Sequence, residues 1–149
     1  MKRLTILFLA TAAIVPVGIS QAATRAHAAR SAKLQLRHTD LGSVLVNRGG
    51  HTVFAFTRDS RNHDRCAATA GCTGIWPMVT TTGTPTLGPG VKRSLVGTIK
   101  VAGTRQVTYA GHPLYTYIGD AGPGDTSYVG QSQFGGKWFA LNAAGQIVK

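Results

Sequence analysis

Short runs of alternating apolar and polar residues follow one another along most of the chain, from residue 41 to residue 148. Alternation with a period of two places the apolar side chains on one face of a β-strand. Turn residues separate the runs, as in NRGG at 47–50 and NAAG at 142–145. The pattern predicts an all-β, mainly antiparallel domain with strands over 43–48, 52–58, 74–79, 97–101, 106–110, 113–118, 137–141 and 146–148.

The chain also repeats itself at an offset of 61 or 62 residues. GHTVFAFTRD begins at Gly50 and GHPLYTYIGD at Gly111, while GIWPMV parallels GKWFAL further on. We therefore expect two pseudo-repeats, over about 41–79 and about 98–148. The two aromatic residues of each repeat are two positions apart, so they share a strand face on which the tryptophan of the repeat can pack. Six rings should be largely buried: Phe54, Phe56, Tyr115, Tyr117, Trp76 and Trp138.

Residues 1–22 have the composition of a cleavable secretory signal peptide. Two basic residues precede an uncharged run over 4–19, and small residues follow it. Cleavage is expected after Ala22, with a second candidate site after Ala28, and a flexible tail over 23–40 would precede the β domain at 41–149. The run is shorter than the roughly 20 apolar residues that span a bilayer. The mature protein is therefore expected to be secreted or extracytoplasmic, in the cell envelope, and soluble.

Basic residues outnumber acidic ones, with sixteen Lys and Arg against five acids, all of them Asp. The formal net charge of +11 falls to about +9 once Lys2 and Arg3 leave with the signal peptide. A basic surface speeds encounters with anionic partners. Outside the cytoplasm these would be lipid head groups or acidic wall polymers, whereas nucleic acid is not expected, because no binding motif is present. We expect a monomer with no transmembrane span in the mature chain.

Cys66 and Cys72 lie close together in the segment CAATAGC. In an oxidising compartment a pair at this spacing predicts a disulfide. Free thiols and metal ligation are the alternatives, the latter because His63 and Asp64 lie nearby and thiolate and imidazole groups suit copper or zinc. No haem-attachment sequence is present, and no cofactor is expected.

Acidic and histidine residues recur at equivalent places in the two repeats. Asp59 and Asp120 follow the aromatic pairs, where a carboxylate commonly accepts backbone N–H groups in a turn. Cation binding or acid–base chemistry, together with the Asp five residues further on in each repeat, is the alternative. His51 and His112 each follow a turn glycine. They are either surface residues or metal ligands.

These motifs together resemble a bacterial secreted-repeat family of unknown function that includes predicted lipoproteins. The family has an aromatic-x-aromatic-x-x-Asp motif, which FAFTRD at 54–59 and YTYIGD at 115–120 match. Its cysteine-rich turn followed by Trp-Pro matches CAATAGC and Trp76-Pro77. Many members of the family carry a lipid-anchoring cysteine after the signal, which this chain lacks, and Phe54 stands where Tyr is usual in the motif. The resemblance implies export and a β-repeat fold, and it implies no particular activity.

Three classes of function are compatible with these features. A non-enzymatic binding or structural module is favoured by the aromatic pairs, the basic charge and the export signal. An extracytoplasmic metal-handling or redox-associated protein is the first alternative. A hydrolase is the second, although no G-x-S-x-G or H-E-x-x-H motif is present. We therefore expect no enzyme, and the candidate binding residues are Tyr115, Tyr117, Asp120, His112, Phe54, Phe56, Asp59 and His51.

Overall fold

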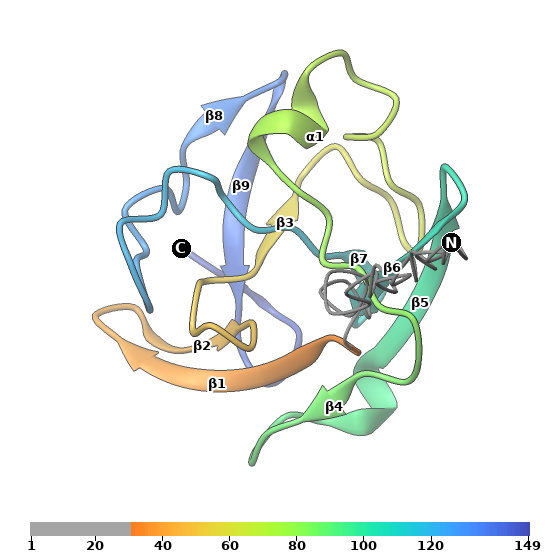
Figure 1. The fold of residues 1–149 in the computed structure, drawn as a ribbon. Helices are drawn as coiled ribbons and strands as arrows, with labels where there is room; N and C mark the ends of the chain where they lie inside the picture. The colour runs from red at the N-terminus through yellow and green to blue at the C-terminus, as the bar shows by residue number, and fades with distance from the viewer. Residues whose placement is uncertain (1–30) are drawn as a thin grey trace, which may run out of the picture.

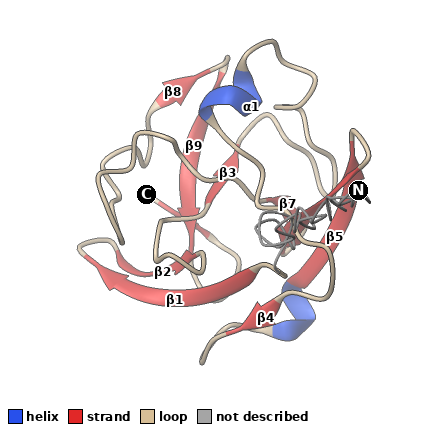
Figure 2. Ribbon diagram, in the orientation of Figure 1, coloured by secondary structure: helices blue, strands red, loops and turns tan. Residues whose placement is uncertain are grey.

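The computed structural model describes residues 31–149, which form short strands with very little helix, as Figure 2 shows. The predicted signal peptide and residues 23–30 of the predicted tail lie outside the described residues. The elements, drawn in Figure 1, are β1 (Lys33–Thr39), β2 (Gly42–Val46), β3 (Phe54–Phe56), α1 (Cys72–Ile75), β4 (Thr86–Leu87), the 3-10 turn η2 (Arg93–Leu95), β5 (Val96–Val101), β6 (Thr104–Tyr109), β7 (His112–Pro113), β8 (Ser132–Gln133), β9 (Gly136–Leu141) and β10 (Ile147–Val148).

Within residues 31–149 the strands form three small sheets. Their strand orders are β2-β1-β4, β10-β9-β3 with β8 also paired to β9, and β5-β6-β7. All the strand pairs are antiparallel except β1 with β4, which is parallel. The prediction of an all-β, mainly antiparallel domain is therefore confirmed.

Strand β1 corrects the prediction of a flexible tail over 23–40. Residues 35–39 of this strand pair with β2, and Lys33 and Leu34 pair with β4. Leu34 is fully buried and Leu36 is partly buried, so the short alternation KLQLRHT has a true inward face. The Ala- and Arg-rich sequence before it obscured this alternation.

The two repeats meet at a pair of equivalent residues. Phe54 and Tyr115, which are 61 positions apart, form an antiparallel bridge with each other. The N–H of Phe54 donates to the carbonyl of Tyr115 at 2.8 Å, and the N–H of Tyr115 donates to the carbonyl of Phe54 at 3.0 Å. A reciprocal bond between equivalent residues places a pseudo-twofold axis between them.

Each repeat pairs its aromatic strand with the tryptophan segment of the other repeat. In the first repeat, β3 pairs with β9 of the second, with Phe54 opposite Ala140. In the second repeat, Tyr115 bridges Met78 of the first, and Met78 is the residue that corresponds to Ala140. The exchange of pairing interlocks the repeats, so a single core is built from both.

The strand predicted over 74–79 is largely wrong. Residues Cys72–Ile75 form the helical turn α1, in which the N–H of Trp76 donates to the carbonyl of Cys72 at 2.8 Å. Pro77 follows and has no N–H to give to a ladder. Only the end of the predicted segment is extended, where Met78 bridges Tyr115.

The buried hydrophobic side chains form an aliphatic cluster, an aromatic cluster and a small third cluster of Val44, Val46 and Ala140. The aliphatic cluster contains Leu34, Leu45, Val53, Ala55, Val79, Val107, Tyr109, Leu114 and Leu141. The aromatic cluster contains Phe54, Phe56, Cys66, Cys72, Trp76, Tyr115 and Trp138. In the described part of the chain, no helix is long and apolar enough to cross a membrane.

Candidate functional site

Two equivalent tryptophans stack on each other at the centre of the aromatic cluster. The ring centroids of Trp76 and Trp138 are 3.7 Å apart, and the ring planes differ by 1°. Phe56 stacks on Trp138 at 4.2 Å, and Tyr117 stacks on Trp76 at 4.7 Å. The four rings form a column with the two tryptophans in the middle, where the pseudo-twofold symmetry places them.

The remaining two rings of the repeat motifs pack edge-on against this column. Phe54 meets Trp76 at a centroid distance of 5.2 Å and an interplanar angle of 75°. Tyr115 meets Trp138 at 5.2 Å and 90°. Edge-to-face contacts are favourable because the positive ring edge faces the negative ring face. Each tryptophan is thus enclosed by rings from both repeats.

Burial decides which aromatic residues can meet a ligand. Phe54 and Tyr115 are fully buried and Phe56 is 2 % exposed, so all three belong to the core. Burial of five of the six rings confirms the prediction for those five. Tyr117 is only half-buried and lies at the end of the column beside Tyr128, with ring centroids 4.3 Å apart. Of the aromatic candidates for binding, Tyr117 is the one that reaches the surface.

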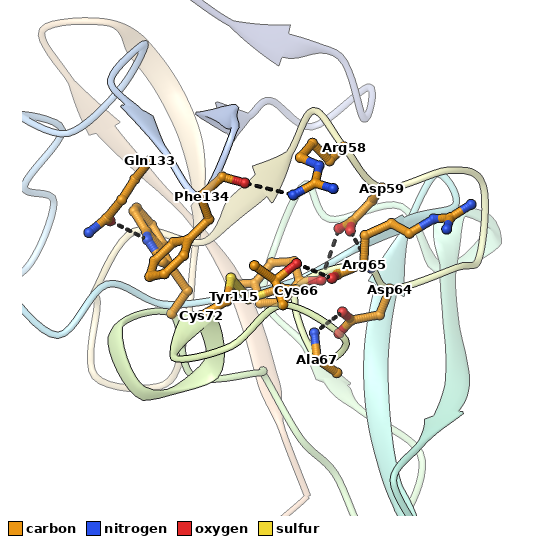
Figure 3. The surroundings of a disulfide bond; sticks show 12 residues. Arg58, Asp59, Asp64, Arg65, Cys66, Ala67, Cys72, Tyr115, Gln133 and Phe134 are labelled. Carbon is orange, nitrogen blue, oxygen red and sulfur yellow. Dashed lines mark hydrogen bonds between the residues drawn. A yellow bond between two sulfur atoms is a disulfide. The ribbon is translucent and has the colours of Figure 1, made fainter.

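Asp59 is anchored between the two repeats (Figure 3). Its Oδ2 accepts a hydrogen bond of 2.9 Å from the hydroxyl of Tyr115, and its Oδ1 accepts one of 2.8 Å from the backbone N–H of Arg65. Burial raises the pKa of Asp59 from 3.8 to about 7, and the nearby charge of Asp64 adds to the shift, while the two hydrogen bonds oppose it. The carboxyl group therefore titrates near neutral pH.

Asp64 and the disulfide lie directly beside this anchor (Figure 3). The side chain of Asp64 is buried, and its Oδ1 accepts the N–H of Ala67 at 2.7 Å. Cys66 and Cys72 form a fully buried disulfide with Cα atoms 5.3 Å apart, which confirms the predicted pairing. Because the sulfur atoms are bonded to each other, they cannot act as thiolate ligands. Across residues 31–149, no group of three His, Cys, Asp or Glu side chains could hold a metal ion.

Asp120 occupies the place in repeat two that Asp59 occupies in repeat one, yet its environment differs. Its Oδ2 is buried and has no hydrogen-bond partner within residues 31–149. Burial raises its pKa from 3.8 to about 7, and the charge of Asp125 adds to the shift. Asp125 accepts N–H groups from Ala121 and Ser127, each at 2.8 Å, and these bonds lower its own pKa. The expected turn bond is thus made by Asp125 and not by Asp120.

The two histidines lie in equivalent turns and are both half-buried. Each follows a glycine with positive φ, 84° at Gly50 and 85° at Gly111. Burial lowers the pKa of His112, and the charge of Arg61 adds to this effect. Open depressions of about 400 Å³ and 310 Å³ lie near the first turn, and both are lined by Arg48. Neither of these depressions is lined by the histidines or the paired Asp side chains.

Sequence reasoning missed two polar residues that complete the aromatic cluster. The Oε1 of Gln133 accepts the indole N–H of Trp76 at 2.8 Å and the hydroxyl of Tyr128 at 3.2 Å. The indole N–H of Trp138, the equivalent group, is buried without a partner among the described residues. Neither Gln133 nor Tyr128 belongs to the repeated motif, so the sequence carried no signal for this contact.

These features define a class of small all-β proteins in which two interlocked repeats enclose a column of aromatic rings. A sequence model described as a secreted repeat of unknown function matches residues 36–80 and 98–142 of the chain, one segment in each repeat. The protein belongs to this family of secreted repeats. Searches of curated proteins and of solved structures found no match.

Proposed function

We propose that the protein is a non-enzymatic, exported binding module that attaches to anionic material of the cell envelope through its cationic surface. The observation that carries this proposal is the segregation of charge between the surface and the interior. The secreted character of the family supports the location outside the cytoplasm.

The cationic side chains lie on the outside of the fold. The exposed ones are Arg37, Arg48, Arg58, Arg61, Arg65, Lys92, Arg93, Lys100, Arg105, Lys137 and Lys149, and Lys33 is half-buried. Four of the five Asp residues, in contrast, are buried or half-buried: Asp59, Asp64, Asp120 and Asp125. Two of these four, Asp59 and Asp120, have a pKa of about 7, so they are partly uncharged at neutral pH. The acids therefore offset little of the positive surface potential.

The contacts of the most perturbed carboxyl group support a structural role over a catalytic one. Asp59 bonds to Tyr115 from the opposite repeat and to the backbone of its own loop. Its acidic neighbour, Asp64, is buried and bonds to the backbone of Ala67. Asp59 thus ties the loop to the core and Asp64 orders the loop itself, whereas a paired-carboxylate hydrolase holds its two groups toward a bound substrate.

Binding to anionic surfaces tests the proposal directly. The mature protein would be mixed with equimolar phosphatidylglycerol–phosphatidylcholine vesicles, and separately with poly(glycerol phosphate), over a range of sodium chloride concentrations. Association should be clear at low salt and should weaken steeply as salt screens the charges. Vesicles of phosphatidylcholine alone are the control. Absence of binding to both anionic probes at low salt, or binding that salt does not weaken, would overturn the proposal.

A further inference from the structure

The two repeats carry loops of very different charge after their aromatic strands. In repeat one the loop contains three exposed arginines, Arg58, Arg61 and Arg65. In repeat two the whole segment 119–136 contains no Lys or Arg. Both loops begin at the same place in the fold and both contain two Asp residues. Repeat two closes the equivalent position without any Lys or Arg, so the three arginines are a feature of repeat one alone.

The loop of repeat one is fixed at several points along its backbone. Ser60 and His63 exchange backbone hydrogen bonds of 3.2 Å and 2.9 Å, which close a tight turn. The N–H of Arg65 donates to Asp59, and the carbonyl of Arg65 accepts the hydroxyl of Thr69 at 2.9 Å. The disulfide begins at the next residue, Cys66. The arginines therefore project from a backbone that is already ordered.

Among the contacts of residues 31–149, the guanidinium groups of the loop leave most of their donors available for a ligand. Arg58 donates to the carbonyl of Phe134 at 2.8 Å, and Arg61 donates to the carbonyl of Ala110 at 3.4 Å. A guanidinium has five N–H donors, so each of these bonds leaves others available. In Figure 3 the guanidinium of Arg65 is directed away from the disulfide. These hydrogen bonds to backbone carbonyls orient the side chains of Arg58 and Arg61 and leave their positive charge in place.

We propose that this arginine loop, residues 58–65, is the site at which the protein binds phosphodiester groups. The inference rests on the proposed function and names the site and the chemistry of the partner. Arginine suits this partner because its planar fork matches two phosphate oxygens. A pre-ordered loop also lowers the entropy cost of binding. The phosphodiester can belong to a lipid head group or to an acidic polymer of the envelope.

A pair of charge-matched triple variants tests the location. Arg58→Gln/Arg61→Gln/Arg65→Gln removes three charges from the loop and keeps an amide donor at each position. Lys92→Gln/Arg93→Gln/Arg105→Gln removes three charges elsewhere, on exposed residues of repeat two and the connection before it. Affinity for poly(glycerol phosphate) and for the phosphatidylglycerol vesicles would be measured at low salt. The loop variant should lose about tenfold more affinity than the matched variant.

The outcomes separate this inference from the proposed function. Equal losses in the two triple variants, with binding by the unaltered protein, would reject the loop as the site and leave a diffuse cationic surface. No binding by the unaltered protein would reject both proposals. Loss of polymer binding alone assigns the site to envelope polymer, and loss of vesicle binding alone assigns it to lipid. Circular dichroism melts check folding, and the single variant Arg65→Gln, which keeps both backbone bonds of residue 65, should still weaken binding if the triple variant unfolds.

Discussion

The hydroxyl of Tyr115 in repeat two donates to the carboxylate of Asp59 in repeat one, and the two atoms are 2.9 Å apart. The symmetric counterpart of this bond would join residue 54 to Asp120. Residue 54 is Phe, which has no hydroxyl, and the Oδ2 of Asp120 is buried without a partner in the described part of the chain. One missing oxygen atom therefore explains why two equivalent acids have different surroundings.

Restoring this oxygen should repair the second site. In Phe54→Tyr the new hydroxyl is expected to donate to Asp120, because repeat symmetry maps it onto the bond of Tyr115. A hydrogen bond to the charged form lowers the pKa of Asp120 below about 7 and should stabilise the fold by about 1 kcal/mol. NMR titration of the Asp120 carboxyl group and thermal melts would measure both effects. The gain should vanish when Phe54→Tyr is made in an Asp120→Ala background, which has no acceptor, and an unchanged pKa of Asp120 would contradict the symmetry argument.

Stability should fall as pH rises from about 4 to about 7 because of Asp59 and Asp120. Both carboxyl groups keep their proton in the folded state up to about pH 7, whereas in the unfolded chain they lose it near their ordinary pKa of 3.8. Their contribution is fully present below pH 3.8 and is lost as pH passes through about 7. His112 acts in the opposite sense, because its pKa is lowered from 6.5 and stability rises as the unfolded form gives up its proton.

Asparagine variants isolate the acidic contribution to this pH dependence. Midpoints of thermal unfolding would be recorded from pH 4 to pH 8 for Asp59→Asn, Asp120→Asn and the unaltered protein. The unfolding midpoint of each variant should change less with pH over this range. Relative to the unaltered protein, the midpoint of the variant should therefore rise as the pH increases. Parallel profiles for all three proteins would show that neither carboxyl group carries the effect.

The two ends of the aromatic column should differ in their effect on stability. Phe56 is 2 % exposed, while Tyr117, its equivalent, is half-buried. Truncation of a buried aromatic ring costs about 3–5 kcal/mol, so Phe56→Ala should fall in that range. Tyr117→Ala should cost less, about 2 kcal/mol, because the ring already contacts solvent. Urea denaturation of the two variants gives the comparison, and a larger loss for Tyr117→Ala would contradict the burial shown here.

The disulfide should stabilise the arginine loop and, through it, the whole fold. Replacement of both cysteines in Cys66→Ala/Cys72→Ala keeps small apolar side chains at two buried positions. The entropy of closing this short loop predicts a loss of about 2.4 kcal/mol. Denaturation with and without a reducing agent would measure this loss. When it is reduced, the unaltered protein should have nearly the same free energy of unfolding as the variant. Equal stability in the oxidised and reduced protein would contradict the prediction.

Local patterns in the sequence predicted much of this fold. The alternation of apolar residues indicated strands, and the spacing of Cys66 and Cys72 indicated the disulfide. The recurrence of the aromatic motif indicated two repeats and a buried ring cluster. Each of these features depends on residues that are close in the chain or on a simple internal comparison.

Contacts between residues far apart in the chain could not be predicted from these local patterns. The sequence does not reveal that Phe54 pairs with Tyr115, or that each aromatic strand pairs with the other repeat, because an internal repeat does not specify how its copies pack. The strand at Lys33–Thr39 was missed because its partner strands confirm it only in three dimensions. The burial of Asp59 and Asp120 was also hidden, since an Asp after a strand is usually a solvent-exposed turn residue.

The exchange of strand pairing between the repeats has a consequence for how such a protein can diversify. An isolated repeat would leave its aromatic strand and its tryptophan segment without partners, and only a second copy could satisfy them, as in a domain-swapped homodimer. A tandem chain supplies that copy at a fixed, high effective concentration, so assembly does not depend on how dilute the secreted protein becomes. Because both copies are encoded in one chain, their sequences can also diverge from each other. One half can then hold the arginines and the disulfide, while the other half provides the hydroxyl that binds Asp59 in the same loop.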